Sequence, residues 1–239
     1  MSKENFLENY KIRVSDRAKR VLLKVSVQNG LEIVIPKRYP KNRIPEIIER
    51  RRAWIETTLK RMDERRRKFT AQAAVLPEMI NLEAIREDWL VEYSFKNSKK
   101  IAITEEPGCV LKVEGEIDNI QLVKKALQKW ISRQARINLL PWLDEVSREI
   151  NLPFLKATIR SQRTRWGSCS SRQTISLNRN LLFLPEELVR YILIHELAHT
   201  VELNHSARYW KVVEEKEPNF KEFDKAMRDG WKWVPAWMM

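Results

Sequence analysis

The strongest constraint on folding is a single apolar helix that carries histidines. Pro185 is followed by Glu186 and Glu187, and proline and acidic residues are typical of the first turn of a helix. The segment 188–197 is rich in large apolar residues, so most of this helix must be buried. The chain therefore has to build a core around a helix that also contains His195.

Two histidines of this helix are spaced to bind one metal ion. His195 and His199 are four residues apart, so both side chains project from the same face. Two neutral imidazoles on one face can share a tetrahedral zinc ion. Glu196 points to the side of this face, where it can reach a water molecule bound to the ion. The spacing predicts a Zn²⁺ site with Glu196 as the catalytic general base.

The third histidine, His205, can complete this site only if the chain reverses direction. In a straight helix His205 would lie ~9 Å beyond His199 along the axis and roughly 240° around it. We expect the reversal at residues 203–204, because asparagine tolerates the left-handed conformation that ends helices. Ser206 would then cap a following helix that contains Tyr209.

Other interpretations of the histidines remain open at this stage. The spacing of His195 and His205 matches the metzincin pattern, but Glu202 stands where metzincins have glycine, which argues against that family. The HExxH sequence also occurs in proteins without metal. Here all three histidines fall within eleven residues, and burying them without a metal would be costly. Alternative third ligands are the downstream glutamates Glu214, Glu215 and Glu222.

A polar segment before the metal helix is a candidate for substrate binding. Residues 163–170 read RTRWGSCS and lie between two strand-like runs, at 156–163 and 174–178. The alternative is a tight turn whose tryptophan packs on the core. The side chains that we expect to contact substrate or a developing oxyanion are Arg165, Trp166, Ser168 and Tyr209.

The first half of the chain predicts a small, mostly antiparallel β module. Residues 20–27 and 31–35 alternate polar and apolar side chains, and Asn29 and Gly30 between them predict a hairpin with a type I′ turn. Further strand-like runs cover residues 81–85, 89–95, 100–103 and 109–113.

Residues 44–68 read as a helix with an apolar stripe and a strongly basic face. Glutamates four residues from the basic residues favour a solvated face with internal ion pairs. The alternative is contact with nucleic acid or another polyanion, which the net charge of +13 also favours.

The second half of the chain is more helical. An apolar face over 123–131 predicts one helix, and residues 138–150 predict another, with Pro141 as a kink or a helix start. We therefore predict an α+β protein with a boundary near residue 116. Residues 1–116 form the β module with the basic helix, and residues 117–239 form a compact domain whose metal helix packs on a small sheet.

Composition restricts the cellular setting. Cys109 and Cys169 are far apart and form no Cys-x-x-Cys pair, so we expect two reduced thiols rather than a disulfide framework. The first ten residues contain no apolar signal segment, and no apolar run approaches the ~20 residues that span a bilayer. We expect a cytoplasmic protein without membrane association.

Several segments together resemble the YgjP-like metallopeptidase family, which is related to the SprT-like zinc proteases. The resemblance is carried by RTRWGSCS, ISLNRNLLFLP and HELAHTVELNHSARYW, and near the N-terminus by RAKRVLLKVSV, LEIVIPK and ERRRAWI. It covers nearly the whole chain and is weakest over residues 70–120. It implies a compact zincin-like core with His205 as the third ligand, but it does not supply the substrate. The substrate that we expect from the HExxH metalloprotease signature is a protein or peptide. Tyr209 stands where the family more often has phenylalanine.

The expected reaction is peptide-bond hydrolysis by a metal-activated water. Zinc lowers the pKa of its water toward ~7, and Glu196 accepts the proton and passes it to the leaving nitrogen. One alternative is zinc-dependent hydrolysis of a nucleotide phosphoanhydride, with Arg163, Arg165 or Arg208 holding phosphates. Another is a nucleic-acid-associated protein without catalysis, in which a fourth protein ligand would close a structural zinc site.

Overall fold

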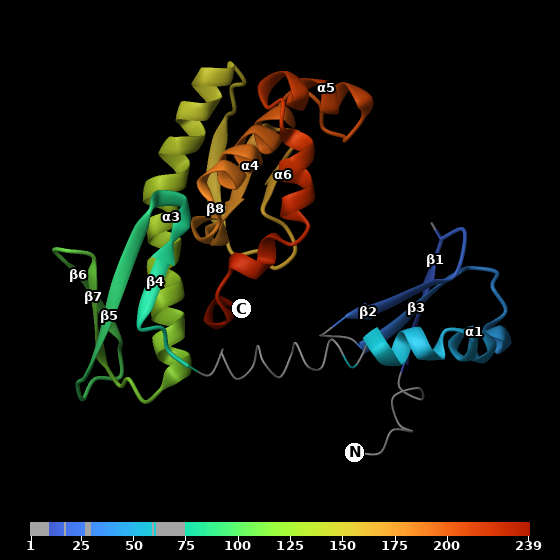
Figure 1. Ribbon diagram of the computed structural model, residues 1–239, viewed down its shortest axis with the longest axis horizontal. Coiled ribbons are helices and arrows are strands. Elements are labelled where there is room, and N and C mark those ends of the chain that lie inside the picture. The colour runs from blue at the N-terminus through green and yellow to red at the C-terminus, as the bar shows by residue number, and fades with distance from the viewer. Residues whose placement is uncertain (1–9, 17, 27–29, 59, 61–74) are drawn as a thin grey trace. The chain divides into compact units, whose positions relative to one another are not determined.

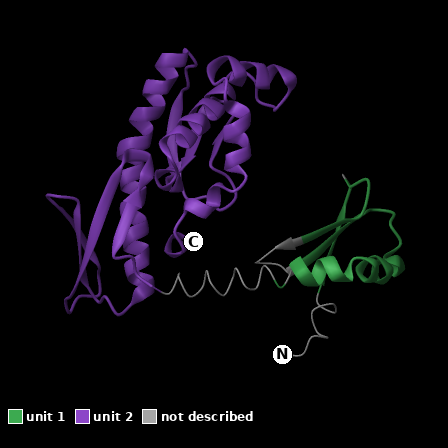
Figure 2. Ribbon diagram, in the orientation of Figure 1, with its two compact units in different colours: residues 1–72 green, residues 73–239 purple. Residues whose placement is uncertain are grey.

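The computed structural model describes residues 10–16, 18–26, 30–58, 60 and 75–239. The chain divides into two compact units, residues 1–72 and residues 73–239 (Figure 2). The described residues contain helices and three small sheets, which confirms the α+β class. None of the described helices has both the length and the apolar character that a membrane span requires.

Unit 1 contains a three-stranded sheet. Its strands are β1 (Tyr10–Ser15), β2 (Leu22–Ser26) and β3 (Gly30–Pro36), in the order β1-β3-β2. β2 pairs antiparallel with β3, which confirms the predicted hairpin, whereas Asn29 of its predicted turn lies outside the described residues. β1 pairs parallel with β3 and was missed by the sequence analysis.

Helix α1 (Ile44–Arg50) follows the short helix η1 (Lys41–Arg43) and packs on this sheet. At Arg51 the helix is interrupted by a non-helical backbone conformation, with φ −109° and ψ 9°. The N–H of Arg51 is shared between the carbonyls of Ile47 and Ile48, at 3.1 Å each. Helical backbone resumes over residues 52–58 and at residue 60. The predicted continuous helix over 44–68 is therefore wrong at Arg51, and its residues 61–68 lie outside the described chain. The hydrophobic core of unit 1 is formed by the sheet and the helical segment together and consists of Leu31, Ile33, Ile35, Ile44, Ile48 and Ile55.

Unit 2 begins with a four-stranded sheet in the order β4-β5-β7-β6. The predicted antiparallel pairing is present between β4 and β5 and between β6 and β7, whereas β5 and β7 at the centre are parallel. The short helix η2 (Glu83–Ile85) replaces the end of the first predicted strand. The bounds are β4 (Met79–Leu82), β5 (Glu87–Phe95), β6 (Ala102–Glu106) and β7 (Val110–Gly115).

Helix α3 (Ile120–Ile150) joins this sheet to the rest of unit 2. It is one helix of 31 residues with Pro141 inside, where the sequence analysis expected two helices. Its Trp130 packs edge-on against Trp89 of β5, with ring centroids 5.2 Å apart, and donates to Glu105 of β6 at 2.6 Å. Because the sheet shares its core with α3, the predicted boundary near residue 116 falls inside unit 2. Figure 1 shows α3 running beside both this sheet and α4.

A third sheet and six helical segments complete the described part of unit 2. The sheet has the order β8-β10-β9, with β8 and β10 parallel and β9 antiparallel at the edge. Its strands are β8 (Lys156–Arg160), β9 (Gly167–Cys169) and β10 (Thr174–Asn178). The helices are η3 (Arg179–Phe183), α4 (Glu186–Ala198), α5 (Ala207–Lys216) and α6 (Phe220–Met227), followed by η4 (Gly230–Trp233) and η5 (Ala236–Met238).

Candidate metal centre

Helix α4 places the first two histidines. It begins at Glu186 after Pro185, as predicted, and its apolar side chains are buried in the core of unit 2. His195 lies in its last turn, and His199 is the C-terminal cap with φ −69° and ψ −11°. The helix therefore ends between the two histidines, and its final turn holds both on one side.

The chain reverses after His199 and returns with His205. The N–H of Glu202 donates to the carbonyl of Ala198 at 3.1 Å, which closes the helix end. The reversal confirms the sequence prediction, but the expected left-handed residue is wrong, because Asn204 is not among the described non-glycine residues with positive φ. The turn closes instead through the N–H of Ser206, which donates to the Asn204 carbonyl at 2.7 Å.

Ser206 then caps the next helix, as predicted. Its side-chain oxygen accepts from the N–H of Tyr209 at 3.3 Å, and α5 begins at Ala207. This cap fixes the start of α5 directly after His205, so the third histidine is held between two ordered elements.

The three histidines converge on one point. Their candidate ligand atoms all lie within 4.8 Å of one another. The Nε2 atoms of His195 and His205 are 3.1 Å apart. Two nitrogens bound at 2.0–2.1 Å to one tetrahedral zinc ion lie about 3.3 Å apart, so this separation fits a shared ion. The glutamates considered as alternative third ligands do not belong to this cluster.

Hydrogen bonds and stacking orient the rings. His199 donates from Nδ1 to the carbonyl of Glu202 at 3.0 Å, which leaves the lone pair of its Nε2 for a metal. Tyr209 stacks on the His199 ring, with centroids 4.4 Å apart, and donates its hydroxyl to the carbonyl of His195 at 3.0 Å. These contacts fix the orientation of the His199 ring without a bound metal ion.

Burial keeps two of the imidazoles neutral. Burial, with smaller contributions from the neighbouring His199 and His205, lowers the pKa of His195 to about 3. Burial also lowers the pKa of His199. Neutral imidazole is the form that binds metal ions, so these side chains do not need to lose a proton at neutral pH.

Glu196 is a buried carboxyl group beside the cluster. It is 4% exposed, and its Oε2 has no hydrogen-bond partner among the described residues. Burial raises its pKa to about 8, and the charge of Arg165 opposes that rise. A buried, unpartnered carboxylate oxygen needs an explanation, and a water or ion at the cluster supplies one.

Comparison with known proteins decides the family. The model of the family described as YgjP-like, metallopeptidase domain, matches residues 19–229. The chain belongs to the YgjP-like metallopeptidase family. No protein with a curated function matches its sequence.

Two solved structures are similar to part of this YgjP-like chain. The metallopeptidase zymogen of Pyrococcus abyssi abylysin is 32% identical, with 36% of this chain and 90% of that chain covered and a TM-score of 0.33. The metallopeptidase zymogen of Methanocaldococcus jannaschii jannalysin is 21% identical, with the same coverages and a TM-score of 0.32.

The predicted substrate residues of this YgjP-like protein lie in different environments. Trp166 is buried and stacks on Trp231, with centroids 4.3 Å apart, so it is a core residue. Tyr209 is fully buried, and its hydroxyl already has an acceptor. Ser168 is half-buried on the edge strand β9, and Arg165 is exposed, with its charge felt by Glu196. Only the last two remain available to a substrate.

Two residues near the site were given no role of their own from the sequence, although Gly167 lies within the predicted segment 163–170. Gly167 packs directly against Glu196. A lone glycine within a short strand is the sequence feature that could have indicated this close approach. Asn178 is fully buried and donates to the carbonyls of Gln162 and Arg165 at 2.7 and 2.8 Å. The side-chain amide of Asn178 therefore anchors the loop that carries Arg165. An asparagine at the end of an apolar strand is the sequence feature that could have indicated this role.

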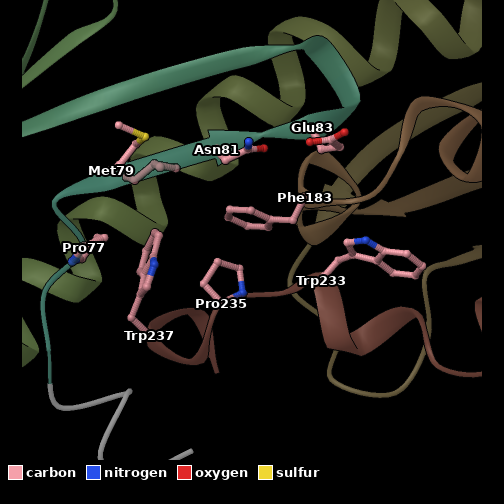
Figure 3. Close-up of a pocket in the computed structure, with 9 residues that line it drawn as sticks. Pro77, Met79, Asn81, Glu83, Phe183, Trp233, Pro235 and Trp237 are labelled. Atoms are coloured by element: carbon pink, nitrogen blue, oxygen red, sulfur yellow. The ribbon is translucent and has the colours of Figure 1, made fainter.

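Unit 2 of the YgjP-like protein also contains a hollow away from the histidines. It has a volume of about 550 Å³ and an aromatic wall that includes Phe183, Trp233 and Trp237 (Figure 3). Its polar side chains are Asn81 and Glu83, and no histidine lines it.

Proposed function

We propose that this protein is a zinc-dependent metallopeptidase that hydrolyses peptide bonds. His195, His199 and His205 would hold the zinc ion, and Glu196 would be the general base. The observation that carries this proposal is the juxtaposition of three imidazoles with a buried carboxylate oxygen that has no hydrogen-bond partner in the described part of the chain. Membership of a metallopeptidase family supports it independently.

The ligand set favours a catalytic rather than a structural zinc site. Structural sites have four protein ligands, whereas the cluster here contains three histidines among the described residues. A zinc ion bound there would supply Lewis acidity and would lower the pKa of a bound water to about 7. The hydrogen bond from His199 to Glu202 and the ring of Tyr209 would keep the ligands in place.

Glu196 would move the proton. Its free Oε2 would accept a proton from the attacking water, and the same oxygen would then donate it to the leaving nitrogen. The carboxylate must be ionised for the first step. The guanidinium of Arg165 already favours that form, and positive charge at the histidine cluster would favour it further.

Protein or peptide substrates would approach along β9. Ser168 lies on this edge strand, and Arg165 precedes it on the anchored loop. We assign both to substrate binding, with Arg165 as the donor best placed to stabilise negative charge near Glu196.

The test compares two glutamates of one helix. Glu196→Gln removes the buried general base, while Glu187→Gln changes an exposed residue in the first turn of α4. Glu196→Gln is expected to lose about 10²–10⁴-fold in turnover of casein or a peptide library and to retain bound zinc. Glu187→Gln is expected to match the unmodified protein in both measurements.

Two results would contradict the proposal. Full activity of the Glu196→Gln protein would exclude general-base catalysis by this residue. Cleavage of nucleoside triphosphates without cleavage of any peptide would replace peptidase activity with phosphoanhydride hydrolysis.

A further inference from the structure

The positive charge of this protein is concentrated in unit 1. Residues 1–72 contain 20 lysines and arginines against 9 aspartates and glutamates, a net charge of +11 out of +13 for the whole chain. Unit 2, which contains the histidine cluster, is therefore close to neutral overall. The excess charge points to a partner of unit 1 rather than to the substrate of the metal site.

A groove in unit 1 gathers part of this charge around an apolar floor. It has a volume of about 480 Å³ and lies between residues 20–23, at the start of β2, and one helical face. That face carries Ile47, Arg50, Arg51 and Trp54, and it continues across the interruption at Arg51. Ile47 and Arg50 belong to α1, and Trp54 belongs to the helical segment that resumes after Arg51. Arg20 adds a third guanidinium from the strand side.

Two side chains of the groove are exposed although they are large and apolar. Trp54 is 46% exposed and Leu22 is 37% exposed, and neither belongs to the core of unit 1. The core is formed instead by Leu31, Ile33 and Ile35 of β3 together with the buried isoleucines of the helical segment. The indole ring of Trp54 is therefore exposed beside arginines, where it can contact a ligand.

The arginines in and beside the groove differ in whether they form an ion pair with a glutamate. Arg52 is paired with Glu49 at 2.6 Å and lies outside the groove. Arg50 has a longer contact with Glu46, 3.4 Å, at the exposed surface. Within the described part of the chain, Arg20 and Arg51 form no ion pair, so their guanidinium groups face the groove without a counter-charge.

We propose that this groove binds single-stranded nucleic acid. Arg20 and Arg51 would contact phosphate oxygens, and Trp54 would stack on a base. The volume suits one or two unstacked nucleotides, within the ~300–1,000 Å³ of small-molecule pockets, and is small for an amphipathic helix about 10 Å across. A base-paired duplex would not place a base on Trp54, because its bases are already stacked.

The experiment uses the full-length protein and fluorescence anisotropy. The probes are labelled oligothymidylate and oligouridylate of about 12 nucleotides, and a duplex of equal length, at about 50 and about 200 mM salt. Arg51→Gln and Arg52→Gln are matched variants, since neighbouring arginines lose the same charge but only Arg51 lines the groove. Trp54→Leu and Trp54→Phe separate an aromatic platform from an apolar one.

The single strand is expected to bind more tightly than the duplex. Arg51→Gln should weaken that binding about tenfold and Arg52→Gln less than twofold. Trp54→Leu should weaken it about tenfold, and Trp54→Phe should recover most of the loss. Circular dichroism verifies that each variant is folded, and the arginine pair decides the proposal if the Trp54 variants do not fold.

Three results would overturn the proposal. They are equal losses for Arg51→Gln and Arg52→Gln, tighter binding of the duplex than of the single strand, and binding to vesicles rich in phosphatidylserine without binding to oligonucleotides. None of these measurements depends on peptidase activity, so their outcome is independent of the proposed function.

Discussion

Glu196 occupies the space that a side chain on Gly167 would fill. A methyl group on Gly167 would lie 2.6 Å from both Cγ and Cδ of Glu196, well inside van der Waals contact. Gly167 belongs to β9 and Glu196 to α4. The strand and the helix can pack this closely because Gly167 has no side chain. The position of the carboxylate thus depends on a glycine 29 residues earlier in the chain.

Gly167→Ala is therefore expected to displace Glu196 while leaving the histidines in place. We expect peptidase turnover to fall about 10²-fold, since a displacement of about 1 Å in a catalytic group has that effect. Bound zinc, measured by metal analysis, should stay near the level of the unmodified protein.

Gly230→Ala provides the matched control for this substitution. A methyl group on Gly230 would contact Trp166 at 3.1 Å and Met227 at 3.3 Å, in the core and not at Glu196. It should lower thermal stability more than turnover. Equal loss of turnover in both variants would indicate a general packing defect instead of displacement of Glu196.

Zinc is expected to stabilise the folded protein. An ion that binds only the native state adds about 2.7 kcal/mol when its free concentration is a hundred times Kd. For a chain of this size that corresponds to an increase in Tm of about 5–10 °C, measurable by differential scanning fluorimetry with and without a chelator. The increase should disappear in His205→Ala, and its persistence there would exclude His205 as a ligand.

Tyr209→Phe removes one hydrogen bond and keeps the ring. The hydroxyl of Tyr209 donates to the buried carbonyl of His195, so we expect a loss of about 1–2 kcal/mol in the free energy of unfolding. Stacking on His199 should persist, and zinc should still bind. Chemical denaturation measures the first effect, and a Tyr209→Phe protein as stable as the original would show that this hydrogen bond contributes nothing.

The thiol of Cys169 is expected to react slowly. Burial, with a contribution from the charge of Glu196, raises its pKa to about 11. Because the thiolate is the reactive form, alkylation by iodoacetamide at pH 8 should be about 100-fold slower than for a free cysteine. In a Cys109→Ser protein, the rate should rise about tenfold per pH unit between about pH 7 and about pH 9.5. A plateau below about pH 9 would contradict the raised pKa.

Local spacing was sufficient to predict that the three histidines lie close together. The histidines at 195 and 199 needed only helical periodicity, and the reversal before His205 followed from the impossibility of a straight continuation. The cap at Ser206 likewise depends on neighbouring residues alone. These features are determined within a dozen residues of the chain, which is why one sequence contains enough information.

Contacts between distant segments could not be predicted in the same way. The packing of Gly167 on Glu196 and the parallel pairing of β1 with β3 depend on tertiary structure. Pro141 suggested a break in α3, but the buried residues Leu139 and Leu143 on either side keep one helix continuous. Propensity at a single position was outweighed there by packing.

The length of α3 determines how far this protein can be shortened. One end of its buried face, at Val123 and Leu127, shares a core with the sheet of residues 79–115, and the other end lies against α4 and β8. A fragment that starts at residue 117 would leave the first of these surfaces bare and prone to aggregation. A minimal fragment that retains the histidine cluster therefore starts near residue 73, and crystallisation or library screening would begin from that truncation.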